Sequence, residues 1–250
     1  MEDKIFVPAL FGGLGDDKSK KPPKEKNRRK TGYRNSDLVL NKQNILDCVE
    51  FTTPSGQFPI PIIKKVDPFE LPTIASTFSK AVCHTKEGVL VVFYEPDVNF
   101  ARVLHNPKRY VETLRKFSCV VGPDFSQKIG MNSFIRFSNN WWNKVLTAYY
   151  QSQGILMIPN VTWSTPSSYD YAFTGIPKHS VIAINSTGII GNPAAIYLWR
   201  KGYEEVLFKL KPTIIIRYGD KIPGEREGIS VYYENLNLRN LRNGRKRISC

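Results

Sequence analysis

Blocks of hydrophobic residues alternate with mixed blocks from residue 89 onward. Each hydrophobic block is short and mostly β-branched, which is typical of a strand buried on both faces of a parallel sheet. We predict six such strands, at Val89–Tyr94, Cys119–Val121, Ile155–Val161, Ser180–Ile184, Thr213–Ile216 and Ile229–Tyr233. Between several of them apolar residues recur every three or four positions, which predicts helices over Pro107–Phe117, Trp141–Gln153 and Pro193 to about Lys211.

Strands that alternate with helices at this spacing are typical of βαβ units, and therefore of an α/β fold with a mainly parallel sheet. Two architectures fit this order: an irregular TIM-like (β/α) barrel and an open doubly wound sheet. No helix is predicted between Ser164 and Lys178, and this irregularity favours the barrel. Strands at Asp37–Leu40 and Phe58–Ile63 would complete it, unless the residues before 89 form a separate lobe.

Positive charge is concentrated near the two ends of the chain. The 250 residues include 36 Lys+Arg and 22 Asp+Glu, which gives a formal net charge of +14. Residues 1–30 account for +4 and residues 239–250 for +5, and neither segment has enough apolar residues to bury a core. We therefore predict a flexible basic arm over residues 1–35, one α/β domain over residues 36–238 and a basic tail over residues 239–250.

Basic segments of this kind either contact the phosphate backbone of a nucleic acid or simply keep a protein in solution. The first alternative makes nucleic acid a partner, held by basic side chains from both segments: Lys20, Lys21, Arg28, Arg29, Lys30, Arg245, Lys246 and Arg247. No zinc-finger, RNP or basic-zipper pattern occurs, so nothing in the sequence supports base-specific recognition.

Several classes of protein are excluded by features that the sequence lacks. No apolar run approaches the roughly 18–20 residues that span a bilayer, and the first residues do not resemble a secretory signal. We therefore expect a cytoplasmic protein with no membrane partner. The four cysteines and three histidines show no metal-ligand spacing, so no metal site is predicted. The composition leaves any cofactor and the oligomeric state open.

Candidate catalytic residues lie where the predicted strands end, because ligands of parallel α/β folds bind beyond the carboxyl ends of the strands. Asp124 follows a strand and a rigid Gly122-Pro123 pair, so its carboxylate can act as a base, a nucleophile or a hydrogen-bond acceptor. Asp97 and Asp220 follow two other strands and are the further catalytic candidates. The alternative is that Asp124 caps or braces the loop that follows it.

Other polar and aromatic residues at these strand ends are candidate ligand-binding residues. They are Ser126, Asn160, Trp163, Ser186 and Tyr218. Trp163 can stack on a base or a sugar ring, although a packing role in the core is equally consistent with its position. A pair of carboxylates can carry out acid–base chemistry at a suitable separation, which a sequence does not contain.

A set of motifs around these positions resembles one uncharacterised family. The motifs are Val121–Ser126, Ala148–Gln151, Gly154-Ile155, Ile158–Trp163, Ser168–Pro177, Ser186–Gly188 and Arg217–Gly219. The family is a domain of unknown function found in bacteria, phages and mobile elements, and the resemblance covers about residues 55–220. Gly122 and Asn160 depart from the family pattern without affecting Asp124 or Trp163. The resemblance implies an α/β body, a phage or mobile-element setting with the host cytoplasm as location, and no known reaction.

Three functions are consistent with these features. An enzyme would act on nucleic acid or nucleotides through a strand-end pocket, with the basic segments holding phosphates. A noncatalytic accessory protein would associate with nucleic acid and use the α/β body as a scaffold. An interaction factor in phage or plasmid biology would need no nucleic acid at all.

Overall fold

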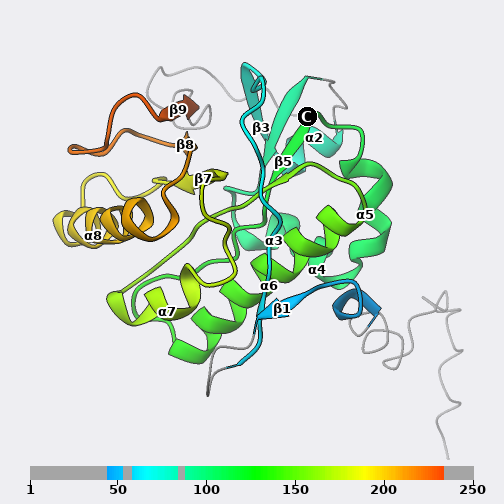
Figure 1. Ribbon diagram of the computed structural model, residues 1–250, viewed down its shortest axis with the longest axis horizontal. Coiled ribbons are helices and arrows are strands. Elements are labelled where there is room, and N and C mark those ends of the chain that lie inside the picture. The colour runs from blue at the N-terminus through cyan, green and yellow to red at the C-terminus, as the bar shows by residue number, and fades with distance from the viewer. Residues whose placement is uncertain (1–43, 53–57, 84–87, 234–250) are drawn as a thin grey trace, which may run out of the picture. The chain divides into compact units, whose positions relative to one another are not determined.

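The computed structural model describes residues 44–52, 58–83 and 88–233 (Figure 1). Within these ranges seven parallel strands follow one another in chain order. Hydrogen bonds group them into a four-stranded sheet, β3-β4-β5-β6, and a three-stranded sheet, β7-β8-β9. A parallel bridge between Asn160 and Ala183 joins the two sheets. The strands are β3 (Ile74–Thr77), β4 (Val89–Val92), β5 (Cys119–Val121), β6 (Met157–Ile158), β7 (Val181–Asn185), β8 (Ile214–Tyr218) and β9 (Ser230–Tyr233). The prediction of an α/β fold with mainly parallel strands is confirmed.

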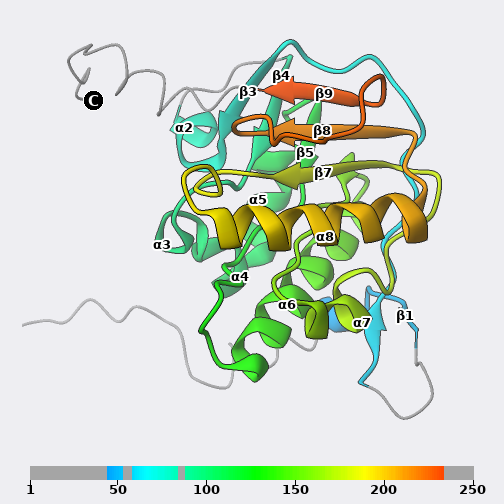
Figure 2. The same ribbon diagram turned by 90° about the vertical axis from the view of Figure 1, so that its left-hand side faces the viewer.

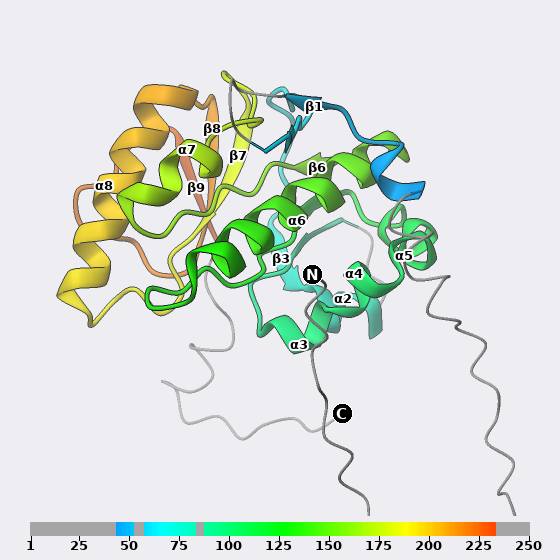
Figure 3. The same cartoon turned by 90° about the horizontal axis from the view of Figure 1, so that it is seen from below.

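Helices connect the strands and lie outside them, with α8 and α5 on opposite sides of the strands (Figures 1 and 3). The helices are α2 (Phe78–Cys83), α3 (Asp97–Phe100), α4 (Arg102–His105), α5 (Pro107–Leu114), α6 (Ser133–Ser152), α7 (Tyr169–Ala172) and α8 (Pro193–Leu210), with a 3₁₀ turn at Pro166–Ser168. Helix α8 starts where the sequence predicts, because Asn192 caps it by accepting a hydrogen bond from the backbone N–H of Ala195. In the described ranges no helix is both long and apolar enough to cross a membrane.

The first strand of the main sheet differs from the prediction. The segment Phe58–Ile63 contains β2 (Ile60–Pro61), which pairs antiparallel with β1 (Phe51–Thr52) in a separate two-stranded sheet. The prediction that this segment adds a strand to the main sheet is wrong, because two prolines remove backbone donors that a central strand needs. The strand beside β4 is β3, which is too short and polar to be recognised from its sequence. The predicted strand at Asp37–Leu40 lies outside the described residues.

Two helices also differ from their predicted extents. Helix α6 begins at Ser133 instead of Trp141, because Asn132 caps it by accepting a hydrogen bond from the backbone N–H of Phe134. Exposed apolar residues in its first turn hid the periodicity there. The short helix α7 lies between Ser164 and Lys178, so the prediction of no helix in that segment is wrong.

Apolar side chains alternate between the two faces of the strands, and this alternation defines separate cores. Val91 and Phe93 pack outward with residues of α2–α6, whereas Ile182 and Ile215 pack outward with residues of α7 and α8. The inner faces of all seven strands share one further cluster, formed by Ala75, Leu90, Val92, Tyr94, Cys119, Val121, Ile158, Val181, Ala183, Ile216, Tyr218 and Tyr233. Within the described ranges no backbone pairing joins β3 to β9, so the structure does not show a closed sheet.

Candidate functional site

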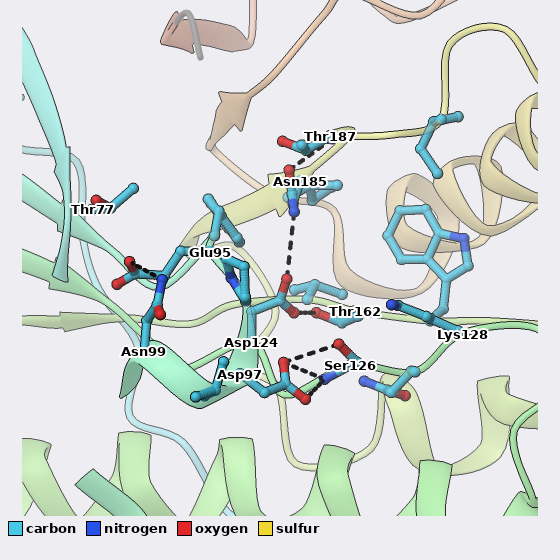
Figure 4. A pocket seen from close by; sticks show the side chains of 18 of the residues that line it. Thr77, Glu95, Asp97, Asn99, Asp124, Ser126, Lys128, Thr162, Asn185 and Thr187 are labelled. Atoms are coloured by element: carbon cyan, nitrogen blue, oxygen red, sulfur yellow. Dashed lines mark hydrogen bonds between the residues drawn. The ribbon is translucent and has the colours of Figure 1, made fainter. Parts of the chain in front are cut away.

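A cavity of about 920 Å³ lies beyond the carboxyl ends of the strands (Figure 4). Five successive strands contribute residues to its wall, because parallel neighbours bring their carboxyl ends to one edge. The contributing residues at or after β3, β4, β5, β6 and β7 include Thr77, Glu95, Asp97, Asp124, Ser126, Thr162, Trp163 and Asn185. The predicted residues Asp97, Asp124, Ser126 and Trp163 are thus brought together.

Asp124 is half-buried in the cavity wall, and three neutral side chains hold its carboxylate. The Oδ1 atom accepts hydrogen bonds from Thr162 Oγ1 at 2.6 Å and Asn160 Nδ2 at 3.0 Å. The Oδ2 atom accepts a longer bond from Asn185 Nδ2, at 3.5 Å. These donors come from the ends of β6 and β7, so Asp124 connects strand ends and does not brace the loop that follows it.

Burial raises the pKa of Asp124 above its usual range. The hydrogen bonds from Thr162, Asn160 and Asn185 lower this pKa, and the nearby charge of Asp97 raises it, with burial the largest effect. The pKa is therefore shifted toward the neutral range, in which a carboxyl group can exchange protons with a ligand. Perturbed carboxyl groups of this kind concentrate at functional sites.

Two further carboxylates in the cavity are also held by neutral donors. Asp97 accepts a hydrogen bond from the Ser126 hydroxyl at 2.9 Å and from the Ser126 backbone N–H at 3.2 Å. Glu95 accepts bonds from the backbone N–H of Ser79, at 2.8 Å, and from Asn99 Nδ2, at 3.2 Å. Among the described residues none of the three carboxylates forms an ion pair. The lining thus holds three carboxylates and two lysines, Lys80 and Lys128.

A polar stripe on α6 fixes the loop that carries Asp124. Asn143 accepts a hydrogen bond from the Phe125 backbone N–H at 2.8 Å, and Asn140 donates to the Thr162 carbonyl at 3.1 Å. Thr147, one turn beyond Asn143, leaves so little room that a Cβ atom on Gly122 would lie 2.3 Å from its Oγ1. This stripe was not predicted from the sequence, although its members recur at helical spacing on the buried face of α6.

Trp163 forms an aromatic wall of the cavity through its packing against α8. Its ring centroid lies 5.8 Å from that of Trp199, which stacks on Tyr203 with 5.0 Å between centroids. Gly202 makes this approach possible, since a Cβ atom there would lie 2.0 Å from Trp163 Nε1. Trp163 therefore packs on α8, one of the two roles that the sequence left open, and it also lines the cavity. Stacking on a ligand stays a prediction.

The other predicted site residues are placed outside the cavity wall. Asn160 is buried behind Asp124, and its Oδ1 accepts a hydrogen bond from Tyr94 at 2.9 Å. Ser186 is buried and donates to the backbone carbonyl of Asp220 at 2.5 Å, and Tyr218 packs on Tyr94 in the inner cluster. Asp220 is not among the lining residues of the cavity.

The predicted nucleic-acid contacts all lie outside the described residues. The structure therefore does not bear on the basic side chains at residues 20–30 and 245–247. In the part of the chain that the structure describes, no three His, Cys, Asp or Glu side chains are arranged to hold a metal ion.

Comparison with known proteins supports the resemblance seen in the motifs. Residues 53–234 match the family model described as Domain of unknown function (DUF4417). The chain belongs to this family. It is 31% identical over 134 residues to the Gene 1 protein of Mycobacterium phage L5, which covers 54% of this chain and 58% of that protein. It is 32% identical over 132 residues to the Gene 1 protein of Mycobacterium phage D29, which covers 53% of this chain and 49% of that protein.

The match to these phage relatives is partial: the chain spans about half the length of each. No solved structure matches the chain. The prediction of an uncharacterised, phage-associated family is confirmed, and the residues of the cavity lie within the matched range 53–234.

Proposed function

We propose that the strand-end cavity binds a nucleotide unit, free or within a nucleic acid, and that Asp124 acts there as a general acid–base group. The observation that carries this proposal is the position of Asp124: a carboxyl group with a raised pKa, held by three side chains at the edge of a cavity. Such a group can protonate a leaving atom or accept a proton from an attacking hydroxyl.

The wall of the cavity supports a ligand with hydroxyl groups and a flat ring. Carboxylates without cationic partners attract hydroxyl donors, as on a sugar, and repel phosphates. Trp163 supplies a surface for a ring to stack on, and Lys80 and Lys128 are the two cationic lining residues, both exposed. We therefore place the sugar of the nucleotide beside Asp124 and Asp97, and its phosphate outward toward the lysines.

One buried donor at the cavity also supports a ligand. Gln127 lines the cavity, and its Oε1 accepts a hydrogen bond from Asn140 at 3.3 Å. Because Asn140 also donates to the Thr162 carbonyl, its Nδ2 is a donor, and this fixes the orientation of the Gln127 amide. The Nε2 atom of Gln127 is then left with no partner among the described residues, which a water or a ligand acceptor would satisfy.

We also infer that the seven strands enclose an irregular TIM-like barrel. A cluster that draws inner-face residues from every strand is expected of a barrel interior. The side-chain hydroxyl of Tyr233 in β9 donates to the carbonyl of Pro72, just before β3, so the two outer strands are linked where no backbone pairing occurs. In this proposal residues 36–238 are the single α/β domain, and the flanking basic segments contact nucleic-acid phosphates in the host cytoplasm.

The proposal is tested with Asp124→Asn and the matched control Asp220→Asn, which changes a carboxylate outside the cavity. We expect Asp124→Asn to abolish turnover of nucleotides or short oligonucleotides while leaving the protein folded, and Asp220→Asn to retain it. Turnover by Asp124→Asn at the wild-type rate would overturn the acid–base role. Binding without turnover in the wild type would instead favour a noncatalytic accessory protein.

The pH dependence of stability provides a second test of Asp124. A carboxyl group whose pKa is raised by folding binds its proton more tightly in the folded state. The contribution of Asp124 to stability is therefore present at low pH and is lost as the pH rises through its folded pKa. We expect urea unfolding between pH 4 and pH 8 to show that Asp124→Asn gains stability relative to the wild type as the pH rises. An unchanged difference across this range would contradict a raised pKa.

A further inference from the structure

A second cavity, of about 630 Å³, lies between α7 and the carboxyl end of α8. Helix α8 starts after β7 and ends before β8, so it runs from the carboxyl ends of the strands to their amino ends (Figure 2). Its 18 residues span about 27 Å. The second cavity is therefore at the opposite end of the strands from the cavity that contains Asp124.

Lysine side chains dominate the charge of this second cavity. Lys178 and Lys211 are exposed, and neither forms an ion pair with a described residue. Lys209 pairs with Glu205 at 3.2 Å, and its Nζ also lies 5.5 Å from the ring centroid of Phe173. Asp170 is the acidic residue of the lining, so the cavity carries a net positive charge.

An aromatic side chain lies among these lysines and is left open to solvent. Phe208, on the last turn of α8, is 76% exposed. Tyr169 and Phe173 line the same cavity, and the hydroxyl of Tyr169 is buried with no partner among the described residues. An exposed aromatic ring beside unpaired cations matches the requirements of a stacked base and its phosphates.

The backbone holds the lysines together in an unusual conformation. Lys211 has φ 47°, and His179, next to Lys178, has φ 54°; both are in the left-handed region that non-glycine residues rarely occupy. The two segments are joined by a hydrogen bond from the His179 backbone N–H to the Leu210 carbonyl, at 2.9 Å. This junction brings Lys178 close to Lys209 and Lys211 although about thirty residues separate them in the sequence.

We propose that this second cavity is a binding site for single-stranded nucleic acid. Lys178 and Lys211 contact successive phosphates, and the ring of Phe208 stacks on a base between them. The site does not depend on the function proposed for the strand-end cavity, since it uses different residues at the opposite end of the strands. A partner protein with an acidic segment would contact the lysines without stacking on Phe208. Substitution of Phe208 therefore distinguishes a nucleic acid from an acidic protein partner.

The test measures binding of a fluorescently labelled oligo(dT) to the full chain by anisotropy, at several salt concentrations. We expect Lys178→Gln/Lys211→Gln to weaken binding about tenfold and to reduce the slope of log affinity against log salt by about 1.4, from two single-strand phosphate contacts. The matched control is Lys108→Gln/Lys116→Gln, two exposed lysines of the α5 region outside either cavity. This control keeps the affinity within about twofold.

Phe208 tests whether a base is recognised. We expect Phe208→Ala to weaken oligo(dT) binding about tenfold and Phe208→Tyr to keep the wild-type affinity, because stacking needs a ring. If the two double lysine variants weakened oligo(dT) binding equally, only the total charge would matter, and this result would overturn the proposed binding site. Loss of binding in the lysine variant with no change in Phe208→Ala would overturn the stacked base and favour an acidic partner. Nucleotide binding at the cavity of Asp124, measured in the same variants, is expected to stay unchanged.

Discussion

The two ends of the parallel strands carry opposite charge and hold it in different ways. At the carboxyl ends, Asp97 and Asp124 accept hydrogen bonds from neutral side chains that neighbouring strand ends supply. At the amino ends, Lys178 and Lys211 are exposed and form no ion pair with a described residue. An oriented, half-buried carboxylate suits directional contact with a small ligand, whereas exposed lysines suit the diffuse charge of a polymer.

A third arrangement of charge is a buried ion pair near the carboxyl ends of the strands, in which a carboxylate and a guanidinium pair with each other away from solvent. Arg217 on β8 donates from Nε to Glu225 at 2.7 Å and from Nη2 at 2.8 Å, and both side chains are completely buried. A third nitrogen donates to the Ile184 carbonyl at 2.8 Å, and the guanidinium lies 4.6 Å from the ring centroid of Trp199. Neither residue lines the strand-end cavity or the second cavity, and the guanidinium packs against Trp199 in the wall of the strand-end cavity.

The largest effect is expected when this closed pair is broken. Arg217→Met should destabilise the protein by about 3–5 kcal/mol, because it leaves Glu225 buried without a cationic partner. Urea unfolding measures the change. Arg217→Met/Glu225→Gln should recover most of the loss, since glutamine keeps an acceptor for the Ile222 backbone N–H without a charge. If the double variant were as unstable as the single one, the unpaired charge would not be the cause.

The next effect concerns a buried lysine that contacts Thr174, a lining residue of the second cavity. Lys144 on α6 is buried and donates to the backbone carbonyls of Tyr171 and Thr174, the latter at 2.8 Å, and burial lowers its pKa to about 7. Between that value and its unfolded pKa the unfolded chain binds more protons, so stability rises with pH. The wild type should gain about 2 kcal/mol between pH 7 and pH 9 relative to Lys144→Met. A constant difference in urea unfolding would contradict the lowered pKa.

Substitution of Gly202 tests the packing of the aromatic wall, because the direction of the change in stability depends on that packing. Alanine in place of glycine inside a helix usually stabilises it by up to about 1 kcal/mol. Here the added Cβ would collide with Trp163, so Gly202→Ala should destabilise the protein by about 1–3 kcal/mol and weaken ligand binding at the strand-end cavity. Lys201→Ala, on the exposed side of the same helix, is the control. A gain in stability would show that Trp163 does not pack against Gly202.

The smallest change in stability is expected from the loss of one hydrogen bond in the strand-end cavity. Ser126→Ala removes the hydroxyl that donates to Asp97 and leaves the backbone N–H contact in place. We expect a loss of about 0.5–1.5 kcal/mol in thermal or urea unfolding. The exposed Ser167 provides the comparison, since Ser167→Ala should change stability by less than about 0.5 kcal/mol. Equal effects of the two substitutions would contradict an ordered Asp97.

Much of the fold could be predicted because local patterns encode it. The buried runs of β4, β5, β7 and β8 are continuous and mostly β-branched, and helix α8 has a proline and an asparagine cap at its start. Strand β3 could not be predicted in this way, since its four residues alternate weakly. Its place beside β4 depends on pairing with a strand whose hydrophobic run is much stronger.

The candidate site was predictable only in part, for a geometric reason. Asp124 follows an apolar strand and a rigid Gly-Pro pair in the chain, so it could be named as a candidate before the fold was known. Its hydrogen-bond partners depend on the fold, because Asn160, Thr162 and Asn185 come from two other strand ends.

The two ends of the strands illustrate the same limit. Nothing local distinguishes Asp97, which lines the cavity, from Asp220, which does not. Nothing local links Lys178 to Lys211, which line one cavity where the His179 backbone N–H is hydrogen-bonded to the Leu210 carbonyl. A sequence records which residues precede and follow a strand, whereas shared cavities depend on contacts between segments that are far apart in the chain.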